Sequence, residues 1–502
     1  MPLLTLEAFM ANKFYITTPL YYVNASPHIG HAYTTVAADC LARYYRSKGS
    51  DVYFLTGTDE HGQKVQKAAK DKGVKTLEFV DETVAIFKEL WKDLDISYDD
   101  FIRTSEERHT KTVQESLKRL LKSGDLYVDK YEGWYCLPCE TFWTETQLQA
   151  QACPDCKRPA DRISETTHFL KLSEHQDWLT KYILAHPSFI QPDFRCNEVL
   201  SFLKNNKLSD LCITRPKSRL NWGIEVPFSD EHVVYVWFDA LLNYISAVGF
   251  TYDEKKFKKY WPADIHLIGK DILRQHAIYW PIILHALGLE PPKMIFAHGW
   301  WLVGEDKMSK SRGNIVDPNF IVREFGKDAF RYFLLRDVPF GLDGNFSQEA
   351  LIKRINSDLA NDLGNLLQRT LTMVEKYSGA KAPAAEIRNA DFLSRINNLG
   401  ACLDESLPKL DFISAFEKIW ELINMANKYI EDTKPWVLVK EKKSQELNEF
   451  LFLLIGVLKA VARNLSSFMP QTSRTILAEI GADAIRKGKP LFPRIDNPAP
   501  NT

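Results

Sequence analysis

Short apolar runs that end in glycine-marked loops and lead into helical patterns occur in two distant parts of this 502-residue chain. The first part contains "KFYITTPLYYV", a helix-like segment that ends at Gly49, and "DVYFLTGTDEHG". The second part repeats this order in "HVVYVWFDALLNYI", "DIHLIGKDILRQHAIYWPIIL" and "KMIFAHGWWLV". Strands that alternate with helices form parallel sheets covered by helices. The pattern therefore predicts an α/β fold with one doubly wound, Rossmann-like parallel sheet that is split in the sequence.

Two other sequence patterns occupy the rest of the chain. Between the halves of the predicted sheet lie two C-x-x-C pairs and proline-marked turns such as "RPKSRLNWG", which indicate an insertion. Beyond the second half, long segments place apolar residues at i, i+3, i+4 and i+7, which predicts an all-helical domain. We expect the sheet in residues 1–115 and 228–345, the insertion in 116–227 and the helical domain in 346–502.

Composition excludes several classes of protein. The chain start lacks a basic region followed by a long apolar run, and no later stretch resembles a membrane span. Eight cysteines are too few for a disulfide scaffold in a chain of this length, so we predict a cytoplasmic protein. The formal net charge of -1 neither supports nor excludes a nucleic-acid partner, because a local basic patch can supply the attraction.

The cysteine pairs are Cys136 with Cys139 and Cys153 with Cys156. Two C-x-x-C turns at this spacing match a tetrahedral Cys₄ zinc site. Four thiolates leave no coordination position open for chemistry, so the predicted Zn²⁺ is structural. The alternatives are a redox pair, which two pairs disfavour, and cysteines without metal.

Two motifs carry groups that bind anions. His28 and His31 fall three residues apart at the expected start of a helix, where unpaired N–H groups and the helix dipole attract phosphate. Lys307 and Lys310 lie in "GEDKMSKSRGN", a glycine-edged loop that could close over a polyphosphate. Taken alone, each motif is more often a capping pair or a solvated basic loop. Together, at one edge of an open sheet, they indicate a nucleotide site.

These residues resemble a known family. "HIGH" at residues 28–31 followed by "KMSKS" at residues 307–311 resembles the signature of class I aminoacyl-tRNA synthetases. "YITTPLYYVNASPHIGHAYTT", "TGTDEHGQK", "YVWFDALLNY", "LIGKDILRQHAIYWP" and "KPW" are similar to methionyl-tRNA synthetases, and the resemblance covers nearly the whole chain.

The resemblance implies the activation of methionine with ATP and Mg²⁺, followed by transfer of methionine to the terminal ribose of tRNA(Met). It implies catalytic roles for His28, His31, Lys307 and Lys310, and ATP binding by these four together with Gly269 and Asp271. The implied methionine-binding residues are Leu20, Tyr22, Asp59, Trp237, Ala240, Leu241, Tyr244, Ile272 and His276. Taken singly, most of these apolar and aromatic residues are more often packing residues than ligand contacts.

The helical domain is expected to read the anticodon. The resemblance implies this role for Asn365, Arg369 and Trp436, and unpaired bases commonly stack on aromatic side chains. The insertion corresponds to the connective domain of the family. Many relatives carry a further C-terminal domain that makes them dimers; the sequence ends without a β-rich tail, so we expect a monomer.

Two other functional classes are alternatives for this pattern. A synthetase for cysteine would be expected to bind zinc in its amino-acid pocket, and one for leucine-like side chains to carry a much larger insertion. A non-catalytic tRNA-binding protein on the same scaffold would tolerate loss of His28, His31 or Lys310, and all three are present.

Overall fold

The computed structural model describes residues 13–496, apart from residues 138, 144, 146–147, 149–150, 155, 304–305 and 308–315. The chain divides into two compact units. The first contains residues 1–27, 45–91 and 97–299, and the second contains residues 28–44, 92–96 and 300–502. Each unit is described by itself below.

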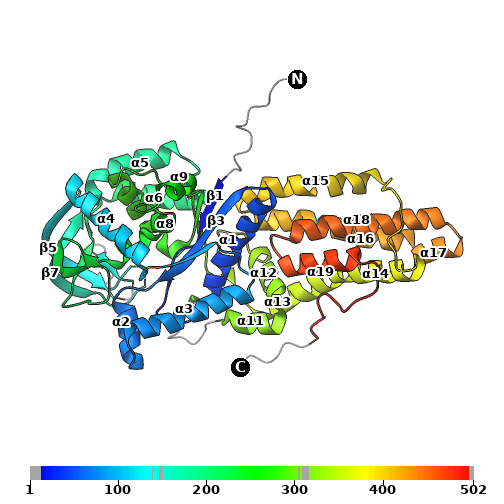
Figure 1. Ribbon diagram of the computed structural model, residues 1–502, viewed down its shortest axis with the longest axis horizontal. Helices are drawn as coiled ribbons and strands as arrows, with labels where there is room; N and C mark the ends of the chain where they lie inside the picture. Colours follow the sequence, from blue (N-terminus) through cyan, green and yellow to red (C-terminus); the bar gives the residue numbers. More distant parts are fainter. Residues whose placement is uncertain are drawn as a thin grey trace, which may run out of the picture. The chain divides into compact units, whose positions relative to one another are not determined.

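A parallel sheet forms the centre of the first unit (Figure 1). In the described part of the chain its strands follow the order β2 (Tyr21–Tyr22), β3 (Asp51–Asp59), β1 (Lys13–Thr17), β13 (Ile265–Gly269), β14 (Ile295–His298) and β8 (Ile190–Gln191), with β4 (Asp100–Arg103) paired to β3. Every pairing in this sheet is parallel. Strands from residues 13–59 therefore pair with strands from residues 265–298, which confirms the predicted split sheet.

Helices and short segments complete the first unit. They are α2 (Gln63–Lys72), α3 (Thr76–Asp93), α4 (Glu107–Ser123), α5 (Gln176–Ala185), α6 (Asp193–Asn205), α7 (Val236–Leu241), α8 (Asn243–Ser246), α9 (Glu254–Tyr260), α10 (Trp280–Ala286), a 3₁₀ turn at Lys270–Ile272 and a π turn at Gln275–Tyr279. Apolar side chains from β1, β3, β13, α4, α7 and α10 pack into one core. The sheet strands are buried over most of their length, as expected for a parallel sheet covered on both faces.

The insertion forms antiparallel structure. One sheet has the order β6 (Thr141–Trp143), β5 (Leu126–Cys136), β7 (Asp161–Leu170) and β9 (Leu211–Cys212), and a second contains β10 (Thr214–Pro216), β12 (Ser229–Val234) and β11 (Glu225–Val226). The long β5–β7 pair runs from the core of the unit to the cysteine turns.

The second unit is mainly helical. Its described elements include α1 (Ile29–Ser47, through residue 44), a small sheet of β16 (Asp306–Lys307), β15 (Trp301–Val303) and β17 (Gly344–Asn345), α11 (Pro318–Phe325), α12 (Lys327–Arg336), α13 (Gln348–Arg354), a π-helical segment at Ile355–Gly364, α14 (Asn365–Tyr377), α15 (Ala390–Ser406), α16 (Phe412–Thr433), α17 (Pro435–Lys440), α18 (Ser444–Leu465) and α19 (Pro470–Gly481). Helices α14, α15, α16 and α18 pack as a bundle (Figure 1), which confirms the predicted helical region. None of the helices in the described residues has the length and apolar character needed to cross a membrane.

A buried ion pair ties α1 to the helices of the second unit. Arg331 on α12 contacts Asp39 on α1 at 2.7 Å, and both side chains are fully buried. The same guanidinium donates hydrogen bonds to the carbonyls of Phe468, Ser467 and Leu94. Buried charges are tolerated when they are paired and hydrogen-bonded in this way.

Removing the Arg331 guanidinium should therefore destabilise the second unit. We expect Arg331→Met to cost roughly 3 kcal/mol, because it leaves the buried Asp39 carboxylate with only the partly exposed Arg43 and removes the donor to three carbonyls. At roughly 2–4 °C per kcal/mol, the melting temperature should fall by roughly 6–12 °C. Arg43→Met is the matched control, since Arg43 contacts the same carboxylate at 2.7 Å but is partly exposed. Equal melting temperatures for the two variants would contradict this account.

Candidate active site

A buried carboxylate with one unpaired oxygen lies at the carboxyl end of β3. Asp59 is only 7% exposed, and its Oδ1 has no hydrogen-bond partner among the described residues. Burial, followed by the charges of Asp239, Glu140 and Glu60, raises the pKa of Asp59 well above its usual range. An added cation would strongly stabilise the ionised form of such a buried carboxylate.

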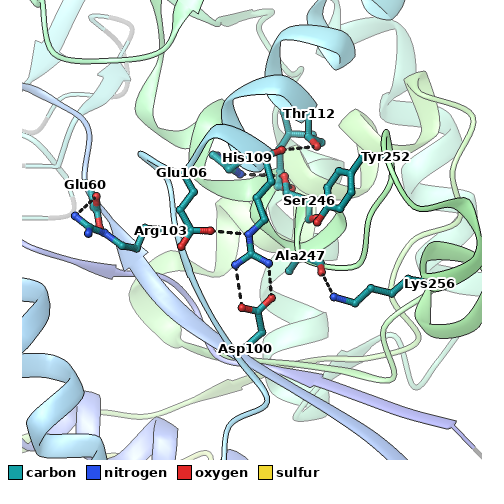
Figure 2. A network of polar contacts seen from close by, with 12 residues as sticks. Glu60, Asp100, Arg103, Glu106, His109, Thr112, Ser246, Ala247, Tyr252 and Lys256 are labelled. Atoms are coloured by element: carbon teal, nitrogen blue, oxygen red, sulfur yellow. Dashed lines mark hydrogen bonds and ion pairs between the residues drawn. The ribbon is translucent and has the colours of Figure 1, made fainter.

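The adjacent carboxylate, Glu60, is fully paired. Its Oε1 accepts hydrogen bonds from Thr58 Oγ1 at 2.7 Å and from Arg103 Nε at 2.6 Å. Its Oε2 accepts from Arg103 Nη2 at 3.2 Å and from the Ser105 hydroxyl. Figure 2 shows the contact between Glu60 and Arg103. Two neighbouring acids in one loop thus differ: Glu60 holds the loop in place, and Asp59 is left available.

A third acid, Asp239 on α7, is shared by two histidines. Its Oδ2 lies 2.7 Å from His61 Nδ1 and its Oδ1 lies 2.7 Å from His109 Nε2. His109 Nδ1 also lies 2.9 Å from the hydroxyl oxygen of Ser246. Figure 2 shows His109 and Ser246 side by side. Burial alone would raise the pKa of Asp239, but the two histidines outweigh it and lower the pKa. Asp239 is therefore charged next to Asp59 and connects α7 to the β3 loop.

Two predicted pocket residues lie beside Asp59. Tyr22 on β2 is the register partner of Asp59 on β3. Leu20 lies over Gly57 of β3, where an added Cβ would come within 2.9 Å of its Cδ2. The Tyr22 hydroxyl donates to Glu140 Oε1 at 2.9 Å, and both side chains are largely enclosed. These contacts set Leu20, Tyr22 and Asp59 at one edge of the sheet.

Three further predicted residues form one hydrogen-bonded chain. His276 Nδ1 donates to the Ile272 carbonyl at 2.9 Å, so neutral His276 accepts the Tyr244 hydroxyl at Nε2, over 2.8 Å. Burial lowers the pKa of His276 to about 4, against smaller raising effects of the Ile272 carbonyl and Asp271. His276 is therefore neutral at pH 7, and its tautomer fixes the direction of the Tyr244 hydroxyl.

The remaining predicted pocket residues lie on α7. Ala240 and Leu241 are buried, and Trp237 is partly buried. The indole Nε1 of Trp237 is buried without a hydrogen-bond partner within the described part of the chain. Because Asp239 on the same short helix contacts His61, α7 is held against the loop that carries Asp59.

Gly269 ends β13 and Asp271 follows it, at the same carboxyl edge of the sheet. Gly269 is the register partner of His298 on β14. An added Cβ at Gly269 would come within 2.6 Å of Asp271 Oδ1, so the exposed Asp271 side chain folds back over this glycine. A side chain at residue 269 would displace it.

In the second unit, His28 and His31 lie at the start of α1. Their rings stack with centroids 3.8 Å apart. His28 Nδ1 accepts the Gly30 N–H at 3.1 Å, and His31 Nδ1 accepts the His28 N–H at 3.2 Å. Burial, and then the neighbouring His28, lowers the pKa of His31 well below its usual range. In its neutral form each ring carries its proton on Nε2, where it can donate to an anion.

The predicted lysine loop falls largely outside the described residues. The backbone of Lys307 lies in β16, where it pairs with Leu302 of β15. The Lys307 side chain and all of Lys310 lie outside the description, so their predicted roles stay predictions.

The four predicted metal ligands converge in the insertion. The Sγ atoms of Cys136, Cys139, Cys153 and Cys156 all lie within 4.8 Å of one another, and none of them is in a disulfide. Cys136 Sγ lies 3.5 Å from Cys156 Sγ, and Cys139 Sγ lies 3.9 Å from Cys153 Sγ. A tetrahedral site with Zn–S bonds of about 2.3 Å places sulfurs about 3.8 Å apart. The four thiols can therefore hold one metal ion.

The predicted anticodon residues lie at one end of the helical bundle. Asn365 and Arg369 lie on the first turns of α14, and Arg369 Nη1 contacts Glu431 near the end of α16 at 3.6 Å. The chain then turns at Lys434, which has φ 48°, into α17. Trp436, on the first turn of α17, is 53% exposed.

Comparison with known proteins identifies the family. The family "tRNA synthetases class I (M)" matches residues 14–166 and 158–371. The methionine–tRNA ligase of Caldanaerobacter subterraneus subsp. tengcongensis is 50% identical in an alignment that covers 97% of this chain and 80% of that protein. The Thermotoga maritima enzyme of the same name is 46% identical in an alignment that covers 96% of this chain and 80% of that protein. The chain belongs to the class I methionyl-tRNA synthetases.

A solved methionyl-tRNA synthetase has the same fold. The Mycobacterium tuberculosis enzyme bound by methionyl-adenylate matches with a TM-score of 0.92 and 40% identity, over 96% of this chain and 100% of that chain. The predicted family, fold class and ligase activity are thereby confirmed. Sequence reasoning missed Glu140, Asp239 and His61 near Asp59, and also His109 and Arg103, which contact Asp239 and Glu60. "DEHG" and the aspartate in "VWFDALL" were visible, but their pairing across the fold was not.

The histidine pair generates a direct prediction. A Cβ at Gly30 would lie 2.9 Å from Cε1 and 3.1 Å from Nδ1 of His28, so Gly30→Ala should push the His28 ring aside. Misplacing a group by about 1 Å can cost roughly 100-fold in rate, and we expect the rate of methionine activation to fall by roughly 10- to 100-fold. The melting temperature should not fall, because alanine favours helix over glycine.

Gly400→Ala in α15 is the matched control for this substitution. Its added Cβ would meet only Asn464 Oδ1, at 3.9 Å, which is an ordinary contact. Full activity in both variants would show that the position of the His28 ring is irrelevant to the reaction.

Proposed function

We propose that this chain activates L-methionine with ATP, releasing pyrophosphate, and transfers the methionyl group to the 3′-terminal ribose of tRNA(Met). The observation that carries the proposal is the unpaired Oδ1 of Asp59 in a buried, aromatic-rich part of the sheet edge. A methionyl-adenylate complex of a 40% identical relative supports the choice of substrate.

Asp59 is assigned to the methionine ammonium group. The ammonium supplies the positive charge and the donors that Oδ1 lacks. Leu20, Tyr22, Trp237 and Tyr244 would pack around the thioether chain, since sulfur is favoured at aromatic edges. The further lining residues that we assign to the pocket are Ala240, Leu241, Ile272 and His276.

ATP is assigned to the two histidines and to the β13 loop. His28 and His31 would donate Nε2–H bonds to phosphate oxygens at the start of α1, where the helix dipole also favours an anion. Gly269 lets the Asp271 side chain lie over its backbone. Both residues are assigned to ATP, with the Asp271 carboxylate accepting hydrogen bonds from hydroxyl groups of the ribose. Lys307 and Lys310 are assigned to the leaving pyrophosphate, and Mg²⁺ bound with ATP would help to neutralise the charge of the phosphates.

The activation step needs no nucleophile from the protein. The methionine carboxylate attacks the α-phosphorus, and pyrophosphate carries away the bonding electron pair. The ribose hydroxyl of tRNA then attacks the carbonyl carbon of the adenylate, and AMP leaves. The side chains contribute by positioning the reactants and by donating hydrogen bonds to the charge that develops on phosphate oxygens.

The other finer assignments follow the same reasoning. Exposed Trp436 offers a stacking surface for an anticodon base, with Asn365 and Arg369 as hydrogen-bond donors. Zn²⁺ is the ion that best suits four thiolates at tetrahedral spacing, and it would be structural. The monomeric state and the cytoplasmic location stay predictions.

Amino-acid-dependent exchange of labelled pyrophosphate into ATP tests the proposed reaction. With each of the twenty amino acids in turn, we expect exchange above background only with methionine, and only with Mg²⁺ present. Exchange with a different amino acid would overturn the assigned pocket. No exchange with any amino acid would overturn the activity.

The raised pKa of Asp59 predicts a pH dependence of methionine binding. The ammonium group requires the ionised carboxylate, whereas protonation is favoured by burial and the neighbouring acids. Affinity should therefore be full above the raised pKa, and should fall by up to about tenfold per pH unit below it. As the pH is lowered, the loss of methionine affinity should therefore begin at a pH above about 3.9, the ordinary carboxyl pKa.

Asp59→Asn is the matched variant for the pH experiment. It should bind methionine weakly at every pH from 5 to 8, as measured by isothermal titration calorimetry, because it cannot ionise. A wild-type affinity that is flat over this range would contradict the raised pKa. An Asp59→Asn variant that binds like wild type would contradict the ammonium assignment.

A further inference from the structure

Glu140 connects the cysteine turns to the edge of the sheet. It directly follows Cys139, in the turn between β5 and β6, and has a left-handed backbone with φ 49°. Despite this position in a turn, it is only 4% exposed. A non-glycine residue with positive φ and a buried carboxylate persists only when its surroundings fix it.

The backbone of Glu140 is fixed from the pocket side. Its carbonyl accepts the hydroxyl of Tyr235 at 2.6 Å, and Tyr235 is almost fully buried. Tyr235 directly precedes α7, the helix that carries Trp237, Ala240 and Leu241. The turn of Cys139 is thus attached to the start of a helix that we assign to methionine binding.

The side chain of Glu140 is fixed by two other elements. Oε1 accepts the Tyr22 hydroxyl at 2.9 Å and the backbone N–H of Lys64, at the start of α2, at 3.3 Å. Lys64 Nζ also lies 5.1 Å from the centre of the Tyr22 ring. The Tyr22 ring is therefore held at its hydroxyl by Glu140 and covered by a cation.

Gly62 shows how closely this group is packed. Its φ is 113°, and an added Cβ would collide with the Tyr22 hydroxyl and lie 2.8 and 2.9 Å from the two carboxylate oxygens of Glu140. Gly62 lies in the "DEHG" loop, three residues after Asp59. Glu140 is also one of the charges that, with burial, raise the pKa of Asp59, so the group adjoins the proposed ammonium site.

We propose that Glu140 is a positioning residue through which the four-cysteine metal site orients Tyr22 for methionine binding. This inference rests on the proposed function of the pocket. When bound, the metal would fix the Cys139 turn, and the turn sets the position of the Glu140 carboxylate. That carboxylate accepts a hydrogen bond from the Tyr22 hydroxyl, which fixes the orientation of the ring. Because the Tyr22 ring is already fixed, less conformational entropy is lost when methionine binds.

Calorimetric titration with methionine, with metal content measured on the same samples, tests this role. We expect Glu140→Gln to raise the methionine Kd by roughly three- to tenfold, because the neutral amide oxygen is a weaker acceptor for the Tyr22 hydroxyl than the carboxylate, with one metal ion per chain retained. The KM for ATP should not change. Glu132→Gln is the matched control, because Glu132 lies on β5 of the same insertion with an exposed side chain.

The mechanism requires that Glu140 act through the Tyr22 hydroxyl. Tyr22→Phe alone should weaken methionine binding by a similar factor, and adding Glu140→Gln to it should cause no further loss. Removing the metal with a chelator should raise the methionine Kd of the wild type more than that of Tyr22→Phe. Circular dichroism of the metal-free samples reports whether the fold persists.

The outcomes separate this inference from the function on which it rests. Wild-type affinity in Glu140→Gln, or additive losses in the double variant, would overturn the positioning role while leaving the pocket assignment intact. Equal changes in methionine Kd and ATP KM together with loss of metal would also overturn it, because they indicate general disruption. A wild-type protein that does not bind methionine would overturn both.

Discussion

A buried carboxylate with one unpaired oxygen is the constraint on which the candidate site depends. Asp59 Oδ1 lacks a partner among the described residues, although an ionised carboxylate away from water needs a cation or donors. Its acidic neighbours do not share this shortage: Glu60 is paired with Arg103, and Asp239 is shared between two histidines. These contacts hold the loop in place, while Asp59 Oδ1 lacks a cation or donor that an ammonium group would supply.

Other elements of the first unit fix the surroundings of Asp59. The parallel sheet brings the ends of β2, β3 and β13 to one edge, so residues more than 200 positions apart in sequence face one region. Buried aromatic groups with fixed hydrogen bonds surround it, as in the chain from Ile272 through His276 to Tyr244. In the second unit, α1 is held by Arg331, which fixes the helix whose first turn carries the histidine pair. Both arrangements place donors and acceptors before any ligand arrives.

The sequence predicted those parts whose signal is local. Two C-x-x-C turns specify their own geometry, so the convergence of Cys136, Cys139, Cys153 and Cys156 followed from spacing alone. Alternating strand and helix patterns predicted the split parallel sheet for the same reason. The acidic neighbours of Asp59 could not be predicted from local signals, because Asp239 comes from α7 and Glu140 from the insertion, and they meet only in the folded chain. Glu140 gave no signal in the sequence, since its role depends on a left-handed turn and on contacts with Tyr22 and Tyr235.

A crystal structure of the protein with L-methionine tests the central claim most directly. The account predicts the ammonium nitrogen within about 2.7–3.2 Å of Asp59 Oδ1, the distance of a charged hydrogen bond. Glu60 and Asp239 should keep the partners that they have in the free protein. A methionine molecule whose ammonium group contacts another acid, with Asp59 Oδ1 still unpaired, would contradict the account.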